Sequence, residues 1–193
     1  TKISFVLDKL SSYKSLDAIT DCDVVVYMID STSGIVAYDI KLIEYILRSG
    51  KGVVVAVNKW DMREKGVTTH DYQSYITSYN NIFKKVPIIY ISAKENIHLQ
   101  ELMARVRIVF DGLRIRITTS SINKALAHSF STLKNGDLNI FYATQTGSMP
   151  PRIVLFVNKR TSFTKRHANQ IENTLRTHYQ LLGVPLYIDV RER

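Results

Sequence analysis

A short polar segment at the end of an apolar run carries side chains suited to binding a nucleotide base. Residues 53–57 are apolar and mostly β-branched, which is typical of a buried parallel strand, and Asn58-Lys59-Trp60-Asp61 follows them directly. In open α/β sheets, ligands bind beyond the carboxyl ends of the strands. The tetrapeptide is therefore placed where a ligand is expected.

The side chains of this tetrapeptide suit guanine better than adenine. The Asp61 carboxylate can accept two parallel hydrogen bonds, from guanine N1–H and from the exocyclic amine. Adenine offers an acceptor at N1, and a site built on such polar pairs rejects the wrong partner by about 10⁴-fold. The stem of Lys59 can lie along the base, and Asn58 can touch the base and tie neighbouring loops together.

A second polar segment follows the next apolar run, one βαβ unit later. Ser92-Ala93-Lys94 comes at the carboxyl end of the strand expected over 86–92. We expect the Ala93 N–H to donate to guanine O6, the Ser92 hydroxyl to brace Asp61, and the Lys94 stem to cover the base. Either segment alone could be an ordinary polar turn, but the two together predict a guanine site.

The groups that would hold the phosphates of GTP are missing from this sequence. A phosphate loop has the pattern G-x-x-x-x-G-K-[ST], and no two of the eight glycines are five residues apart. No glycine has an aspartate three residues before it, so the Asp-x-x-Gly segment that serves Mg²⁺ and the γ-phosphate is also absent. The five histidines show neither His-x-x-x-His spacing nor a cysteine pair nearby, so no metal site is predicted.

The elements that must position these loops alternate along the first half of the chain. Apolar runs predict strands, and 3.6-residue periodicity predicts helices. Strands are expected over 24–30, 52–58 and 86–92, and helices over 9–20, 38–49, 70–84 and 98–111. Alternating strands and helices indicate a parallel sheet covered on both faces.

The second half has a different pattern, and the change falls near Gly112. Helices are expected over 119–133 and 164–181, and strands over 138–146, 152–158 and 185–191. Two consecutive strands with helices set to one side predict a small α+β module.

Charge is distributed unevenly between the two halves. Residues 1–111 have 14 Lys and Arg against 13 Asp and Glu, whereas residues 112–193 have 12 against 4. A basic half suggests an acidic partner, most commonly nucleic acid, although a merely solvated basic surface is the alternative. The single cysteine excludes an internal disulfide, and no apolar run approaches the roughly 20 residues of a membrane span.

The two polar segments resemble the base-recognition motifs of translation-factor-like GTPases. The segment FYATQTGSMPPRIVLFVN (141–158), the long helix and the closing VPLYIDVRER resemble the C-terminal KH-like domain of the Der/EngA family of ribosome-assembly GTPases. The resemblance covers essentially the whole chain. It implies that residues 1–112 are the back of a GTPase domain, a partial doubly wound parallel sheet lacking its first strands. It also implies that residues 113–193 are a small α+β KH-like domain.

The resemblance implies a function for the intact protein. That protein is expected to bind GTP and GDP with Mg²⁺, to hydrolyse GTP, and to act in biogenesis of the large ribosomal subunit in the bacterial cytoplasm. Because the chain begins at Thr1, after the family's second switch, we expect it to be a piece separated from preceding GTPase segments and inactive alone. Whether it counts as an enzyme thus stays open, and the missing strands predict an open sheet edge.

The basic half carries candidate contacts for ribosomal RNA. It lacks the Gly-x-x-Gly loop by which KH domains grip single strands. The candidates are instead Lys159, Arg160, Lys165 and Arg166, which flank the turn into the long helix. The alternative function is an RNA- or protein-binding module with a vestigial nucleotide pocket, and relative affinity for guanine and adenine distinguishes the two.

Overall fold

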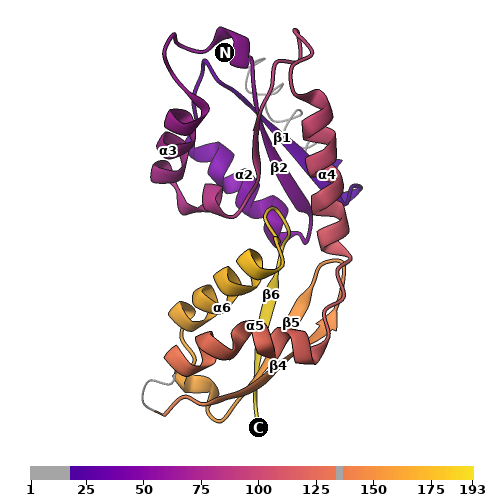
Figure 1. Ribbon diagram of the computed structural model, residues 1–193, viewed down its shortest axis with the longest axis vertical. Coiled ribbons are helices and arrows are strands. Elements are labelled where there is room, and N and C mark those ends of the chain that lie inside the picture. The colour runs from indigo at the N-terminus through magenta and orange to yellow at the C-terminus, as the bar shows by residue number, and fades with distance from the viewer. Residues whose placement is uncertain (1–17, 134–136) are drawn as a thin grey trace, which may run out of the picture.

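The chain forms two three-stranded sheets, one from each half of the sequence (Figure 1). The structure is a computed structural model that describes residues 18–133 and 137–193. The helix expected over 9–20 falls mostly outside these residues, and only 18–20 are seen to be helical. No helix in the described part of the chain is long and apolar enough to cross a membrane.

The first sheet is parallel, and both of its faces are covered. Its order is β1 (Val24–Asp30), β2 (Gly52–Asn58) and β3 (Ile88–Tyr90). Alternate residues of β2 point to opposite faces, as the period of two in a strand requires. Val53, Val55 and Val57 pack towards α2 (Ala37–Arg48) and α3 (Thr69–Tyr79), whereas Val54 and Ala56 pack towards α4 (Leu99–Leu113). The predicted doubly covered parallel sheet is confirmed.

Strand β1 is one of the two edge strands of this sheet in the described part of the chain. Among the described residues β1 pairs only with β2. Two of its apolar side chains, Val26 and Met28, are exposed. An exposed, unpaired strand with apolar side chains is a template for further pairing.

The helix expected over 70–84 is divided in two. Helix α3 ends at Tyr79, and the short 3₁₀ helix η2 (Asn81–Lys84) follows. Between them Asn80 is extended, with φ of −157°, and its side-chain oxygen accepts a hydrogen bond from the Ile82 N–H at 2.8 Å. Asparagine side chains compete in this way with helical hydrogen bonds, which explains the break.

The second sheet is mixed and has helices packed together beside it. Strand β5 (Arg152–Val157) lies antiparallel to β4 (Ile140–Gly147) and parallel to β6 (Tyr187–Glu192). Helices α5 (Thr119–Thr132) and α6 (Lys165–His178) bury apolar side chains against it, and the 3₁₀ helix η3 (Arg160–Ser162) precedes α6. The predicted small α+β module is confirmed.

A loop of the second half reaches back to the first sheet. The Gly183 carbonyl accepts a hydrogen bond from the Val53 N–H at 2.9 Å, and the Gly183 N–H donates to the Lys85 carbonyl at 2.8 Å. The next amide of β2 on that side, that of Val55, bonds to Pro87. Gly183 therefore continues the position of β3 beside β2, where the yellow loop above α6 meets the sheet in Figure 1.

An ion-pair network on α6 contacts the backbone of this loop. Glu172 on α6 accepts from Lys85 Nζ and from Arg176 Nε, each at 2.9 Å. Arg176 Nη1 donates to the carbonyls of Leu181 and Val184, both at 2.7 Å. We call the Gly183 pairing together with the Lys85–Glu172–Arg176 network the clasp. It joins the two halves by backbone and side-chain contacts at once.

Candidate functional site

The predicted base-binding loop leaves β2 through a buried tryptophan. Lys59 is in the left-handed region with φ of 58°, and the 3₁₀ helix η1 (Trp60–Met62) follows. The Trp60 N–H donates to the Ile91 carbonyl at 3.0 Å, and its ring packs at 4.5 Å and 5.4 Å from the rings of Tyr90 and Tyr72. Trp60 thus anchors the loop in the core, and Asp61 is left exposed on its outer side.

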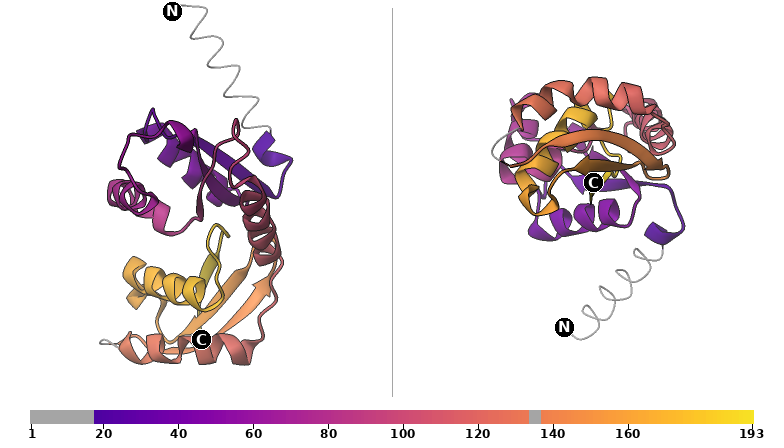
Figure 2. Two further views of the ribbon diagram at one scale, coloured as in Figure 1. Left: turned by 45° about the horizontal axis from the view of Figure 1, so that its top comes forward. Right: turned by 90° about the horizontal axis from the view of Figure 1, so that it is seen from below.

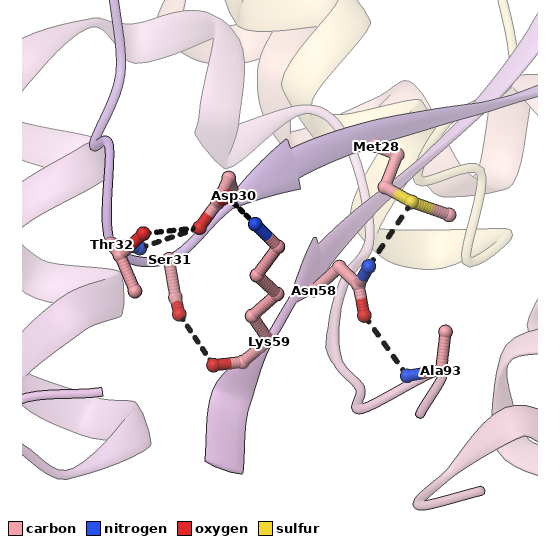
Figure 3. A network of polar contacts seen from close by, with 7 residues as sticks. All are labelled: Met28, Asp30, Ser31, Thr32, Asn58, Lys59 and Ala93. Atoms are coloured by element: carbon pink, nitrogen blue, oxygen red, sulfur yellow. Dashed lines mark hydrogen bonds and ion pairs between the residues drawn. The ribbon is translucent and has the colours of Figure 1, made fainter. Parts of the chain in front are cut away.

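Lys59 is held by an acidic residue at the end of the neighbouring strand. Its Nζ lies 2.6 Å from Asp30 Oδ2, and Thr32 donates to Asp30 Oδ1 from its backbone and its hydroxyl (Figure 3). The hydrogen bond from Lys59, followed by those from Thr32, lowers the pKa of Asp30 to about 2. Asp30 is therefore a fixed negative charge beside the loop.

The sequence prediction did not include Asp30. It ends β1 as Asn58 ends β2, and the two are register partners in the parallel pair. The carboxyl ends of parallel strands meet at one edge of a sheet, so a polar residue ending the first strand could have been added to the site on the same grounds.

Asn58 ties the two polar loops together. Its Oδ1 accepts a hydrogen bond from the Ala93 N–H at 3.0 Å, and its Nδ2 faces Met28 Sδ at 3.5 Å (Figure 3). The expectation that Asn58 ties neighbouring loops matches this contact. The Ala93 N–H, which was expected to donate to guanine O6, is engaged by Asn58.

Ser92 and Lys94 make local contacts. Ser92 is fully buried, and its hydroxyl accepts from the Glu95 N–H at 3.2 Å. No hydrogen bond joins Ser92 to Asp61 in the part of the chain that the structure describes, so the expected brace is not formed. Lys94 is exposed, with its Nζ 3.5 Å from Glu95 Oε1.

The polar groups at the ends of these strands are suited to contact a base. Asp30, Asn58, Lys59 and Ala93 are drawn together, while Asp61 and Lys94 stand at the rim of the same loops. Within residues 18–133 and 137–193, no three His, Cys, Asp or Glu side chains gather where they could hold a metal ion.

The predicted RNA-contact residues surround the start of α6, and all four are exposed. Lys159 Nζ lies 3.8 Å from Asp137 Oδ2, and the Arg160 backbone N–H donates to Glu192 Oε2 at 2.9 Å. Lys165 and Arg166 open α6 and have no ion pair among the described residues. Lys165 additionally lines a cleft between the two halves.

Two protein families match adjoining parts of the chain. Residues 12–111 match the GTP-binding domain of elongation factor Tu, which is more than half of the chain. Residues 116–191 match the KH-domain-like C-terminal region of EngA bacterial GTPase enzymes.

Relatives match over the whole chain. GTPase Der from Caldicellulosiruptor saccharolyticus is 34% identical over 199 aligned positions, and GTPase Der from Caldanaerobacter subterraneus is 32% identical. Each alignment covers 100% of this chain and 45% of the relative, so the chain spans less than half the length of these proteins. Era from Aquifex aeolicus, solved as a variant bound to GDP·AlF4⁻, overlaps 91% of this chain and 67% of its own at 18% identity and a TM-score of 0.40, too low to support a conclusion. The chain belongs to the elongation factor Tu GTP-binding domain family, its KH-like region matches that of EngA GTPases, and over its whole length it is similar to part of GTPase Der.

Proposed function

We propose that this chain supplies the guanine-recognition half of a GTP-binding Der/EngA protein. The observation that carries the proposal is the Asn58–Ala93 hydrogen bond, because it places the Asn-Lys-Trp-Asp loop beside the Ser-Ala-Lys loop in the absence of a base. Asp61 is exposed on the first loop and free to accept the two donors of guanine. Lys59, Ser92 and Lys94 complete the proposed site.

Binding of guanine requires two of the observed contacts to rearrange. The Ala93 N–H would leave Asn58 Oδ1 to donate to guanine O6, and Lys59 would leave Asp30 to lie over the base. The Lys59–Asp30 pair is partly exposed, and the Asn58–Ala93 contact is a single neutral hydrogen bond. Ion pairs at the surface and single neutral hydrogen bonds each contribute about 1 kcal/mol. The rearrangement is therefore within reach of ordinary ligand-binding energies.

The first test is calorimetric titration of the chain with GDP, guanosine and ADP. Equal binding of GDP and guanosine with none of ADP is expected. Asp61→Asn should abolish detectable binding, since an amide places a donor where guanine also has one. Glu64→Gln, at an exposed acidic residue of the same loop, is the matched control and should bind as the unaltered chain does.

Two outcomes would contradict the proposal. Binding of none of the three ligands would mean that these loops do not hold the base without further protein. Much tighter binding of GDP than of guanosine would mean that the chain contains a phosphate site.

The activity of the whole protein is part of the same proposal. GTP hydrolysis, with phosphates and Mg²⁺ held by GTPase segments outside this chain, belongs to the intact protein, and this chain alone is expected to be inactive. The proposed setting is the bacterial cytoplasm, and the proposed role is biogenesis of the large ribosomal subunit. GTP hydrolysis by the purified chain would contradict the proposal that this chain alone is inactive.

Contact with ribosomal RNA is proposed for Lys159, Arg160, Lys165 and Arg166. Reversing these four charges is expected to weaken co-sedimentation with the large subunit and to lower its salt sensitivity, because phosphate contacts release counterions. Unchanged co-sedimentation would count against this surface.

A second candidate function is favoured by one observation. Polar groups of the proposed base site bind each other: Lys59 forms an ion pair with Asp30, and the Ala93 N–H donates a hydrogen bond to Asn58. A site of this kind could be vestigial, and the chain would then be an RNA- or protein-binding module. Equal affinity for guanosine and adenosine would support that reading.

A further inference from the structure

A cleft of about 1040 Å³ separates α6 from the first half of the molecule. Figures 1 and 2 show α6 on the side of the second half that faces the first sheet and its helices. The walls of the cleft come from η2, from α4, from one face of α6 with the loop after it, and from Glu44 on α2. The cleft lies away from the proposed guanine loops, which are at the opposite end of β2.

Three positive charges of the cleft have no ion-pair partner among the described residues. Lys84, Arg105 and Lys165 line it and make no ion pair among the described residues. Its one lining carboxylate, Glu44, pairs with Arg48 at 3.4 Å. The other lining cations, Lys85 and Arg176, are both paired with Glu172 within the clasp. The open part of the cleft therefore has three cations available to an anionic ligand.

Amide side chains form a second group of unused polar atoms. On α6, Asn169 and Asn173 follow Lys165 at four-residue intervals, so all three share one helix face. Asn81 and Gln180 line the cleft as well. No hydrogen bond within the described chain engages any of these four amides, so each presents donors and acceptors to whatever enters the cleft.

Exposed apolar side chains complete the lining. Ile108 on α4 is 49% exposed, and Leu182 on the loop after α6 is 41% exposed. They provide surfaces on which the flat faces of bases can lie. A polar, cationic cleft at the upper limit of the roughly 300–1,000 Å³ of small-molecule sites, which are mostly apolar, suits an extended chain better than a compact ligand.

We propose that this cleft binds a short segment of single-stranded RNA. Lys84, Arg105 and Lys165 contact its phosphates, and Asn81, Asn169, Asn173 and Gln180 hydrogen-bond to the edges of its bases. Unpaired bases expose those edges, whereas the deep, narrow major groove of an RNA duplex hides them from side chains. The proposal adds a base-reading site to the rim contacts proposed above and does not depend on guanine binding.

The test measures binding of a fluorescently labelled 12-nucleotide RNA pool of random sequence to the whole chain. Lys84→Gln with Arg105→Gln leaves the proposed rim residues intact. This variant should weaken binding about tenfold or more and lower the slope of log K against log salt by about 1.4, at about 0.7 per single-strand phosphate contact. The control with the same charge change is Lys65→Gln with Lys124→Gln, at two exposed lysines that do not line the cleft.

A second variant tests the amides without changing side-chain size. Asn169→Asp with Asn173→Asp places two carboxylates on the α6 wall and should abolish detectable binding. Gln73→Glu with Gln100→Glu adds the same charge at exposed positions outside the cleft and should leave most of the affinity. Crosslinks from 4-thiouridine in the bound RNA should map to the cleft walls.

Three results would overturn the proposal. One is RNA affinity that falls when Lys159 and Arg160 are neutralised and is unchanged in both cleft variants. Another is equal affinity for a 12-base-pair RNA duplex and for the single strand. The last is polyglutamate binding as tightly as RNA with the same response to both variants, which would make the cleft a site for acidic polypeptide. Guanosine binding, measured separately, reports on the proposed function whichever result is found.

Discussion

The two ends of strand β2 are built in opposite ways. At the carboxyl end, the Lys59–Asp30 pair stands in water, with side chains 52% and 28% exposed. At the amino end, the Arg176–Glu172 pair of the clasp is 7% and 17% exposed, and Val53 is fully buried. The same strand therefore ends in contacts that a ligand can displace and in contacts that only unfolding or large motion can break.

This difference in burial predicts that contacts at the carboxyl end of β2 contribute little to stability and that contacts of the clasp contribute much. Exposed ion pairs are screened and are worth about 1 kcal/mol or less, whereas breaking a buried pair costs about 3–5 kcal/mol. Substitutions in the clasp should therefore lower stability, and substitutions in the base loops should alter ligand binding with little effect on stability.

Replacing Arg176 by methionine should have the largest effect on stability. The change removes the donor to two loop carbonyls and leaves Glu172 buried with Lys85 as its remaining partner. Arg176→Met should lower the free energy of unfolding in urea by about 3–5 kcal/mol. Arg166→Met, at an exposed arginine of the same helix, should change it by about 0.5 kcal/mol or less. Similar losses of unfolding free energy in both variants would show that the buried contacts of the clasp do not stabilise the protein more than exposed residues do.

Gly183→Ala tests the backbone part of the clasp. Gly183 has φ of +76°, and an added Cβ would press on the Val53 carbonyl oxygen and lie 2.7 Å from Pro87 Cδ. The left-handed conformation costs about 1–2 kcal/mol and overpacking about 1–3, so a loss of about 3 kcal/mol in thermal or urea unfolding is expected.

Gly66→Ala separates the two causes. Gly66 also has a positive φ, +90°, but an added Cβ would meet nothing within 4 Å. Gly66→Ala should therefore lower the free energy of unfolding only by the cost of the left-handed conformation, about 1–2 kcal/mol. Equal losses at both glycines would mean that the approach of Gly183 to β2 is not tight.

The pH dependence of stability should report on Glu172. Burial would raise the pKa of its carboxyl, but the charges of Arg176 and Lys85 and the hydrogen bonds they donate outweigh burial, so the pKa is lowered. A lowered folded-state pKa stabilises the protein above the unfolded value of about 4.3, and that stability is lost as the pH falls through the folded value. Glu172→Gln should reduce the fall in unfolding free energy that urea titrations show as the pH drops below about 4.3. An unchanged fall would contradict the assignment.

The smallest effect on stability is expected at the carboxyl end of β2, where Lys59 pairs with Asp30. Lys59→Gln removes the hydrogen bond that contributes most to the low pKa of Asp30, so this pKa should rise from about 2 towards the ordinary value of about 3.9. The bonds from Thr32 remain and should keep it below that value. Carboxyl chemical shifts followed by NMR give the pKa, and the urea midpoint should stay within error. A clear fall in the midpoint would place the Lys59–Asp30 pair among the stabilising contacts.

The strands of the first sheet were largely predictable from sequence. The apolar runs at 24–30 and 52–58 became β1 and β2 with the predicted limits. The run at 86–92 gave the shorter β3, Ile88–Tyr90. Pro87 has no N–H to donate, and Gly183 occupies the place beside β2 that a longer strand would take.

That the two loops of the proposed base site lie side by side was predictable, whereas their contacts were less so. The strand ends placed Asn58 and Ala93 near each other, because adjacent parallel strands end at one edge. That Asn58 would engage the Ala93 amide, and that Asp30 would engage Lys59, depends on side-chain rotamers that spacing does not determine. The clasp could not be predicted at all, since nothing in the local pattern around Gly183 indicates a partner at Val53.

The hydrogen bond between Val53 and Gly183 joins residues 130 positions apart in a chain that is made from one end to the other. At the usual 5–20 residues per second of synthesis, the Val53 amide is complete roughly 6 to 26 seconds before its partner exists. The β1–β2 pair needs a separation of only 28 residues and can form early in that interval. The order of translation thus favours an assembly in which the carboxyl end of β2 is formed before the two halves are joined.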